Sequence, residues 1–309
     1  MIKTSKKQKI FIVLFILITV ICLLFIKILS IGFWHDDYHY RFSLEETRIV
    51  IDGYHGEDEY VEIPTHLGPF KVSLTSGVYD NNSIIKKIFV PMGLSEGYVF
   101  NNCSNLHEVE FEQGITSINT RFKKCYNLEK VIIPESVTEI GVYAFASCKN
   151  VSDVKIPTSV KYIGLDAFYN TNFEAQHADN KYYIVGDGIL LFYNGPQDCI
   201  VIPKGIRQCN HLYFEDKETC YVYYPETVTD AYLYIPKNVV AYFGDEAINF
   251  RAIDDYQYSA GLFVAPAGSY VEEYCKENNL KFRPMTEEEE KEWREKTEAA
   301  ASEITYQEE

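Results

Sequence analysis

The sequence predicts a solenoid built mainly from short β-strands and turns. The main observation is a repeat: residues 131–150 and 155–172 agree at eight positions when they are shifted by 23. The matched pairs are Ile133/Ile156, Pro134/Pro157, Ser136/Ser159, Val137/Val160, Ile140/Ile163, Gly141/Gly164, Ala144/Ala167 and Phe145/Phe168. A period of this length indicates stacked units. Because the matched residues are almost all apolar or Gly and Pro, they favour a structural role over an active site.

The repeat extends well beyond these two copies. The pattern V-x-I-P-x-S-V-x-x-I-G-x-x-A-F-x-x-C-x-N recurs at 109–127, with Glu112 in place of the proline, and at 88–105, so four units cover about 85–172. A shorter signature, an apolar residue, Pro, two residues and another apolar residue, occurs at 63–67, 90–94, 133–137, 156–160, 202–206, 224–228 and 235–239. We expect another full unit near 233–250. Residues 173–232 form either an irregular insertion or degenerate repeats.

The composition of one unit explains how it folds. In V-x-I, both apolar side chains face one side of a short strand. The proline that follows lacks an N–H for the ladder and ends the strand. V-x-x-I-G supplies a second inward segment, Ala-Phe fills the space between the two, and the Asn of C-x-N can satisfy backbone groups at the turn. A single unit cannot bury its own apolar face, so the units must stack.

The residues that carry the repeat also suggest a family. The run LEKVIIPESVTEIGVYAFASCKN at 128–150 resembles the BspA-like leucine-rich repeat family, an exported bacterial type with a unit of about 23 residues and an A-F-x-x-C signature. Residues 265–282 are similar to the segment with which such arrays often end. The resemblance implies a curved leucine-rich-repeat solenoid with a parallel sheet on its inner face, and roles in surface binding or adhesion. It implies no catalytic residues.

The N-terminal residues predict a membrane anchor. Ile10–Ile26 is a run of 17 residues without charge, preceded by Lys6, Lys7 and Lys9. Counting through Lys27 gives about 22 residues, or about 33 Å of helix, which is enough to cross a bilayer core of about 30 Å. The lysines before the span place the N-terminus in the cytoplasm and the following residues outside the cell. The alternative is a cleaved signal peptide, which would leave a secreted protein.

Charge argues against nucleic acid as a partner. The chain has 29 Lys and Arg against 45 Asp and Glu, a formal net charge of -16. The first 33 residues hold five lysines and no acid, so the remainder holds 24 basic and 45 acidic residues, a formal charge of -21. Such a surface repels phosphate backbones and anionic lipid headgroups.

The eight cysteines fall into two groups. Cys103, Cys125 and Cys148 recur at spacings of 22 and 23, so they occupy one repeated position and are expected to be buried thiols. Among Cys199, Cys209 and Cys220 a disulfide stays open as an alternative. The sequence has no C-x-x-C pair and no clustered histidines beside the cysteines, so we expect no zinc site.

Neither catalysis nor a cofactor is expected. The motifs G-x-S-x-G, H-E-x-x-H and the Walker phosphate loop are absent. His35 and His39 flank two aspartates, and His55 lies in an acidic stretch, but a polar linker and an acidic loop explain them better than a metal site. An envelope hydrolase within 173–232 is a further alternative, although that region has no recognisable nucleophile constellation.

Binding of a protein or glycan ligand at the cell surface is the function we expect. The strand register predicts that Tyr221, Tyr223, Tyr232 and Tyr234 face outward as an aromatic platform, a surface suited to protein interfaces and to sugar rings. Strand propensity alone is the alternative explanation for these tyrosines. The variable outward positions of the repeats, including Glu110, Ile132 and Lys155, should do the recognising. The alternative function is a structural or accessory subunit of an envelope complex with no external ligand.

These observations divide the chain into seven segments. They are a cytoplasmic basic N-terminus at 1–9, a transmembrane anchor at 10–33, a juxtamembrane linker or N-terminal cap at 34–59, regular repeats at 60–172, the irregular region at 173–232, the last repeat and C-terminal cap at 233–285, and an acidic tail at 286–309. The tail contains ten glutamates and three basic residues, and shows no sustained apolar stripe. We expect it to be solvated, and partly helical or disordered.

Overall fold

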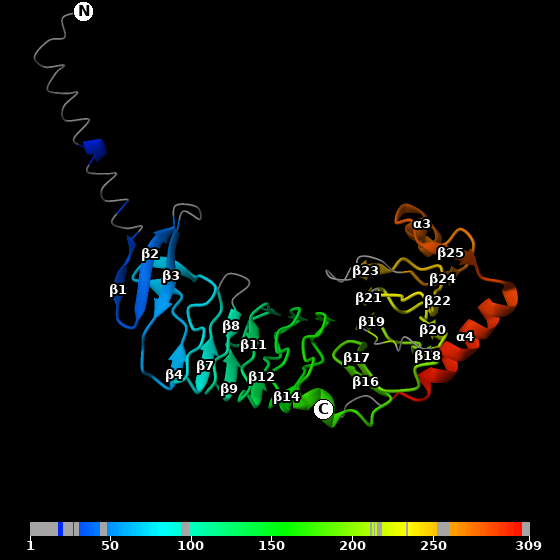
Figure 1. Cartoon of the computed structure of the whole chain (residues 1–309), viewed down its shortest axis with the longest axis horizontal. Helices are drawn as coiled ribbons and strands as arrows, with labels where there is room; N and C mark the ends of the chain where they lie inside the picture. The colour runs from blue at the N-terminus through cyan, green and yellow to red at the C-terminus, as the bar shows by residue number, and fades with distance from the viewer. Residues whose placement is uncertain are drawn as a thin grey trace, which may run out of the picture.

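The computed structural model describes residues 18–20, 27, 31–43, 48–93, 99–210, 212, 214, 218–232, 234–251 and 260–304. Figure 1 shows short strands stacked side by side along the long axis of the molecule, with the longest helix at the C-terminal end. We call residues 33–172 the first half and residues 173–304 the second half. Among the described residues no helix is both long enough and apolar enough to cross a membrane. Most of the predicted anchor at 10–33 lies outside the described residues.

The first half begins with a small sheet that closes the end of the stack. Its strands are β1 (Phe33–His35), β2 (Tyr38–Ser43), β3 (Arg48–Tyr54), β5 (His66–Leu67) and β6 (Phe70–Leu74), in the order β1-β2-β3-β6-β5. The pairs β1–β2 and β2–β3 are antiparallel, whereas β3 and β6 are parallel. The sheet therefore changes from hairpin pairing at the N-terminal edge to the parallel pairing that the repeats need.

The repeats of the first half form three sides. The main parallel sheet, called the first sheet, contains β4 (Tyr60–Glu62), β7 (Lys87–Val90), β9 (Glu108–Phe111), β12 (Lys130–Ile132) and β14 (Asp153–Lys155). The second side contains β10 (Ser117–Ile118), β13 (Glu139–Ile140) and β15 (Tyr162–Ile163), and the third contains β8 (Val99–Asn101) and β11 (Arg121–Lys123). Ile88, Val109, Val131 and Val154 are successive register partners, so the stacking of the four predicted units is confirmed.

The second half contains one parallel sheet and one sheet that is parallel except for the antiparallel pair β16–β17. The main sheet, called the second sheet, contains β18 (Cys199–Val201), β20 (Cys220–Tyr223), β22 (Val239–Tyr242), β24 (Leu262–Ala265) and β25 (Lys281–Pro284). The other sheet contains β16 (Tyr182–Val185), β17 (Ile189–Tyr193), β19 (Gln208–Cys209), β21 (Asp230–Tyr232) and β23 (Asn249–Arg251). The helices are α2 (Asn172–Gln176), α3 (Tyr270–Glu277) and α4 (Glu287–Ala301). Within residues 173–232, α2 and the β16–β17 hairpin come first, and the strands from β18 to β21 then stack in parallel like repeat units.

A column of aromatic rings forms the core of the first half. Ring centroids are 4.9 Å apart for Phe100 and Phe122, 5.6 Å for Phe122 and Phe145, and 5.4 Å for Phe145 and Phe168. All four phenylalanines are buried, and the planes of each successive pair are close to parallel. The predicted role of Ala-Phe as the filler between the sides is therefore confirmed. In the second half, Tyr224, Phe243 and Phe263 make a similar column at 4.7 and 5.7 Å.

Polar side chains of the repeat bond to the preceding unit. The Cys125 and Cys148 thiols point at the carbonyls of Phe100 and Phe122. The Asn127 amide donates to the Ser104 carbonyl over 2.7 Å, as predicted for the Asn of C-x-N. These contacts give hydrogen-bond donors to carbonyls of the preceding unit, two in strands β8 and β11 and one in a turn. Cys103, Cys125 and Cys148 are buried free thiols as predicted, and Cys199, Cys209 and Cys220 are also free.

The rule that proline ends the strand of a unit fails at Pro236. The strand of the unit near 233–250 in the second sheet is β22, which follows this proline and pairs with β20 through Tyr221 and Val240. Residues 234–238 instead precede β22 as a connection. The reason is that Ile235 is completely buried in this connection, so an Ile-Pro step marks an inward-facing turn here and does not end a strand.

One glutamine side chain joins the two halves where the ladder between their strands is interrupted. Gln208 on β19 is fully buried. Its amide nitrogen donates to the Ile163 carbonyl over 2.6 Å, and its amide oxygen accepts from the Ile163 N–H over 3.1 Å. The side chain thereby takes the place of a neighbouring strand for the exposed edge of β15. Tyr232 adds a second link, because its hydroxyl accepts from the Leu165 N–H over 2.9 Å.

Candidate recognition surface

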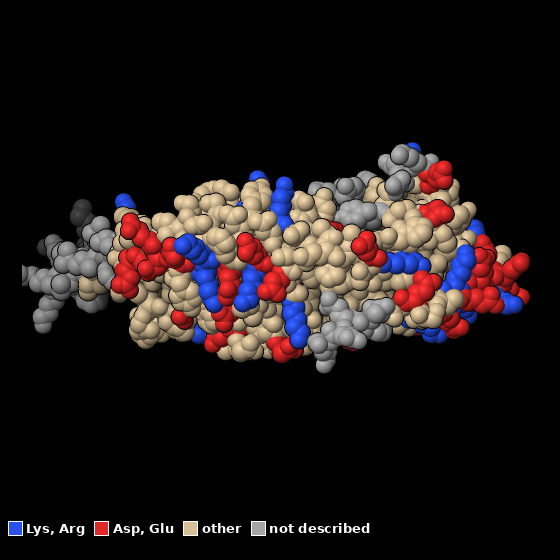
Figure 2. Space-filling model, turned by 90° about the horizontal axis from the view of Figure 1, so that it is seen from below, with Lys and Arg blue, Asp and Glu red and all other residues tan. Residues whose placement is uncertain are grey.

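The first sheet presents two rows of outward side chains in register. One row runs through Tyr60, Lys87, Glu108, Lys130 and Asp153, and the other through Glu62, Phe89, Glu110, Ile132 and Lys155. The alignment predicted for Glu110, Ile132 and Lys155 on successive strands is thus confirmed. Figure 2 shows basic and acidic side chains alternating across this part of the surface. The inward partners are buried, so the outward rows are free to vary without disturbing the core.

Ion pairs within the outward rows order this surface. The Lys87 ammonium lies 2.8 Å from carboxylate oxygens of both Glu108 and Glu110. Hydrogen bonds with these two glutamates raise the pKa of Lys87, and the bond from Lys87 lowers the pKa of Glu108. Because the side chains are partly solvated, each pair contributes little stability, about 0–1 kcal/mol. Their effect is to hold charges at fixed positions, which favours electrostatic selection of a partner.

One of the two outward rows of the second sheet is largely apolar and covered, whereas the other row contains the exposed Tyr221. Register partners across this sheet are Val201, Tyr223, Tyr242 and Val264. Helix α4 packs against these strands, and its Trp293 joins Tyr223, Tyr242 and Val264 in one buried cluster. Figure 1 shows α4 running along the outer side of this end of the molecule. Burying a tryptophan removes roughly 150–250 Å² from water, so this contact is strongly stabilising.

Specific polar contacts fix α4 on the second sheet. The Trp293 indole N–H donates to the Tyr224 carbonyl over 2.8 Å. The Lys296 ammonium lies 3.0 Å from the Tyr223 hydroxyl and 4.2 Å from the centre of its ring. At the start of the helix, Glu289 forms a capping box with Thr286 and accepts two hydrogen bonds from the Arg283 guanidinium. The Arg283 bonds lower the pKa of Glu289 to about 2.

The predicted tyrosine platform does not form. Tyr221 is exposed and Tyr234 is half-buried, but Tyr223 and Tyr232 are buried at 6% relative exposure. Tyr223 does face away from the core, yet α4 covers it. Tyr232 lies at the end of β21, in the other sheet of the second half, and packs against Leu165 at the junction. The four residues therefore do not share one exposed face.

The acidic tail is helical at α4, which the sequence allowed, but the expectation that it is solvated is wrong for one side of this helix. Trp293, Thr297 and Ala300 are buried and recur at intervals of four and three, which places them on one side of a helix. Two signals in the sequence pointed to this arrangement. One was that spacing in an otherwise charged segment, and the other was the apolar character of both faces of strands such as 199–202, which is typical of a sheet covered on both sides.

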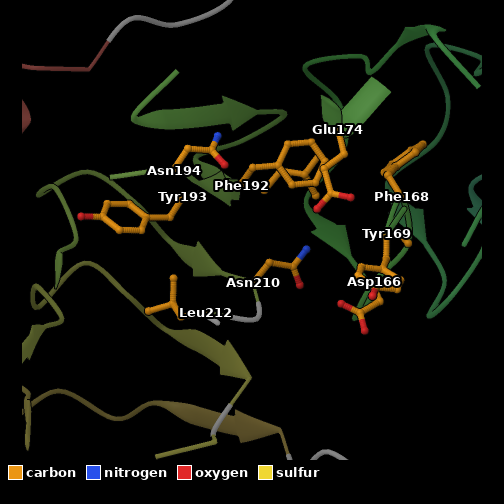
Figure 3. Close-up of a pocket in the computed structure, with 11 residues that line it drawn as sticks. Asp166, Phe168, Tyr169, Glu174, Phe192, Tyr193, Asn194, Asn210 and Leu212 are labelled. Carbon is orange, nitrogen blue, oxygen red and sulfur yellow. The ribbon is translucent and has the colours of Figure 1, made fainter. Parts of the chain in front are cut away.

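A small cavity lies at the junction of the two halves. Figure 3 shows Asp166, Glu174 and Asn210 around one space. Its volume of about 70 Å³ has room for a few water molecules and is far below the roughly 300–1,000 Å³ of ligand pockets. Burial raises the pKa of Glu174, whose carboxylate accepts the Asn170 N–H over 2.7 Å. This geometry explains Glu174 as a structural cap.

The histidines of the N-terminal segment make local contacts. The His39 Nδ1 lies 2.5 Å from Asp52, which also accepts a hydrogen bond from Arg41. The His55 ring packs against Trp34 at 4.4 Å, and His35 lies near Asp36. In the part of the chain that the structure describes, no three His, Cys, Asp or Glu side chains form a group that could hold a metal ion. His39 therefore makes a contact between neighbouring strands of the small N-terminal sheet.

The repeat pattern matches a known family. The chain is a leucine-rich-repeat protein by fold, and residues 72–194 and 119–239 match the BspA type Leucine rich repeat region in six copies. These matches span more than half of the chain, so the chain belongs to this family. No curated protein sequence matches the chain.

Solved structures with some similarity to the chain come from bacteria. A T. pallidum leucine rich repeat protein, TpLRR, has 20% identity and a TM-score of 0.38, covering 68% of this chain and 86% of its own. A leucine-rich repeat protein from Bacteroides ovatus has 17% identity and a TM-score of 0.40, covering 75% and 70%. A leucine rich cell surface protein from Faecalibacterium prausnitzii has 14% identity and a TM-score of 0.29, covering 86% and 97%. The family assignment rests on the repeat match and not on these likenesses.

Proposed function

We propose that the chain is a surface-displayed recognition protein that binds a protein ligand through the outward rows of the first sheet. One observation carries the proposal. The outward rows of the first sheet are mostly polar, in register and at least partly exposed to solvent, whereas α4 covers one apolar row of the second sheet. Side chains that vary between repeats on a constant frame can be changed for a ligand without loss of the fold.

The size of the surface sets the expected strength of binding. The two rows contain ten residues, whereas a typical stable interface uses about 20–30 residues on each side. A ligand that touched only these rows would bind weakly and exchange quickly. Tight binding requires contacts with the loops that border the first sheet as well.

Membrane attachment through residues 10–33 completes this proposal. It is supported by the 17 uncharged residues of Ile10–Ile26 and by the lysines before them. The expected result is that the full chain stays in the membrane fraction after carbonate washing, while protease added to intact cells removes everything after about residue 35. Release of the whole chain into the medium would favour the cleaved-signal alternative.

The binding surface is tested by photo-crosslinking from defined positions. A photoreactive amino acid replaces Ile132 in the first sheet or, as the control, exposed Glu292 on α4 of the full chain. We expect adducts with a protein from envelope or host extracts at position 132, and loss of those adducts when Glu110→Lys and Lys155→Glu reverse the local charges. Adducts that form equally from both positions would contradict a ligand surface on the first sheet. Adducts only with one envelope protein would favour the accessory-subunit function.

A further inference from the structure

A second and larger hollow lies on another side of the first half. It has a volume of about 620 Å³ and lies along β8, β11 and the turns that follow them. This volume falls within the roughly 300–1,000 Å³ that ligand pockets occupy. The hollow shares no residue with the outward rows of the first sheet, so the two surfaces can be tested separately.

The repeat itself explains why the hollow exists. Each turn presents the two residues that follow the core phenylalanine, and in three successive units these are Lys123–Lys124, Ala146–Ser147 and Tyr169–Asn170. The middle unit carries two small residues, between long side chains on both neighbouring units. Since stacked units lie about 4.8 Å apart, the walls are about 10 Å from each other across the small residues. The residues at these variable turn positions therefore determine where the hollow forms.

Cations without acidic partners line the hollow. Arg121, Lys123, Lys124 and Lys149 are all exposed lining residues. No carboxylate of the described residues lies within ion-pair distance of any of these four side chains, whereas Lys87 on the first sheet has two. Four uncompensated positive charges are unexpected in a region of the chain, after residue 33, that carries a formal charge of -21. Such a cluster raises the local concentration of anions.

Aromatic rings surround the same hollow. Tyr126, Tyr143 and Tyr169 line it and are 42%, 41% and 45% exposed. The Lys149 ammonium lies 5.9 Å from the centre of the Tyr126 ring, which places a ring face and a cation next to each other. An amphipathic ring with one face in contact with solvent is a platform for the apolar face of a flat ligand.

We propose that this hollow binds an acidic polysaccharide, with sugar rings on the tyrosines and carboxylate or sulfate groups on the four cations. The combination of rings and cations favours this ligand over a purely ionic one. A nucleic-acid strand carries a phosphate about every 3.4 Å and would run from the four cations onto the acidic remainder of the surface. An acidic peptide offers the charges but lacks sugar rings, whose apolar C–H faces stack on tyrosine.

The test compares probes that separate the charge from the sugar. The full chain in mild detergent is titrated with fluorescent oligogalacturonate, with its methyl ester, with heparin fragments and with poly-L-glutamate. We expect oligogalacturonate or heparin to bind at least tenfold more tightly than both the neutral ester and polyglutamate. The stronger of the two identifies whether carboxylate or sulfate is preferred. Binding should weaken with added salt because exposed charges are screened.

The variants use residues that the same chain places at equivalent turn positions. Lys123→Ala with Lys124→Asn copies Ala146 and Asn170, and Asn is suitable because Lys124 has a positive φ of 58° and Asn170 one of 56°. We expect binding of the acidic sugar to weaken about tenfold, as expected for two exposed ionic contacts. Tyr126→Ser, which copies Ser104, tests the ring in the same way. Lys71→Ala with Lys276→Ala removes two exposed charges elsewhere and should leave binding unchanged.

The outcomes decide between the alternatives. Polyglutamate that binds as tightly as the acidic sugar, loss of binding in the Lys71 and Lys276 control, or no binding of either acidic sugar would overturn the proposal. Glu110→Lys with Lys155→Glu should leave sugar binding unchanged, since these residues lie on the first sheet. A failure of the first-sheet function is therefore distinguishable from a failure of the sugar site.

Discussion

The two halves carry the same kind of parallel sheet, but α4 covers one outward row of the second sheet, whereas both outward rows of the first sheet are at least partly exposed. In the first sheet, Lys87 and Glu108 are register neighbours that pair with each other and face solvent. In the second sheet, Tyr223 and Tyr242 occupy the corresponding kind of position and stack at 4.7 Å beneath α4. The comparison shows that the inward residues specify the stack, and the outward residues decide whether the stack meets solvent or another part of the chain.

Removal of α4 should have the largest effect on this difference. A chain that ends at Met285 leaves Val201, Tyr223, Tyr242 and Val264 uncovered, and a contiguous apolar patch of this kind promotes association. We expect this truncated chain to self-associate at micromolar concentration while the first half keeps its fold. Size-exclusion chromatography with light scattering measures the association. A monomeric truncated chain would mean that α4 does not cover an apolar face.

The aromatic columns should give matched effects in the two halves. Phe145→Ala in the first half and Phe243→Ala in the second each open a cavity in a fully buried stack, and each should reduce the free energy of unfolding by about 3–5 kcal/mol. Urea denaturation followed by circular dichroism measures the loss. Losses below about 1 kcal/mol for either variant would contradict close packing of that column.

The protection of the edge of β15 at the junction should depend on the Gln208 side chain. Gln208→Ala leaves the buried N–H and carbonyl of Ile163 without partners, which should cost about 1–3 kcal/mol. Hydrogen exchange at the Ile163 amide should become faster, while the amides of the aromatic column keep their protection. The exposed Gln113→Ala is the matched control and should change neither quantity. Unaltered exchange at Ile163 in the Gln208 variant would show that another group supports the edge of β15.

Acid should loosen the contact of α4 with the second sheet before it affects the first half. Of the four predicted changes, this one should have the smallest effect. The pKa of Glu289 is lowered from 4.5 to about 2, mainly by Arg283, so its contribution is present above the ordinary value and is lost as the pH falls from about 5 to 2. Trp293 fluorescence, measured in a Trp34→Phe background, follows the contact. In Glu289→Gln this change between pH 5 and 2 should disappear. A fluorescence change that is identical in both proteins would assign it to other carboxylates.

Much of the first half could be predicted because its repeats obey local rules. The burial of Val131 and Phe145, the register of Glu110 with Ile132, and the stacking of four units follow from residue periodicity and nearest-neighbour contacts. These features need no information from distant parts of the chain. The regular copies therefore predict both the inner core and the identity of the outward rows.

The second half escaped prediction because its structure depends on contacts between distant residues. The partner of Tyr223 is Lys296 on α4, 73 residues away in the chain, and a repeat pattern contains no information about that contact. The failure of the proline rule at Pro236 has a similar cause, since Ile235 is buried in a connection and is therefore as apolar as a strand residue. The small residues Ala146 and Ser147 can be read from the sequence, but the hollow that they leave depends on how side chains of the neighbouring units are placed.

Hydroxyl-radical footprinting tests most directly the claim that α4 covers the row of Tyr223 and Tyr242 on the second sheet, while the outward rows of the first sheet stay exposed. Tyr60 on the first sheet and Tyr221 on the second are 51% and 41% exposed, whereas Tyr223 and Tyr242 are 6% and 7% exposed. Oxidation of the full chain, read by mass spectrometry, should modify Tyr60 and Tyr221 quickly and spare Tyr223 and Tyr242. In the chain that ends at Met285, both protected tyrosines should become reactive at low protein concentration. Oxidation of Tyr223 and Tyr242 at the rate of Tyr60 in the full chain would contradict the account.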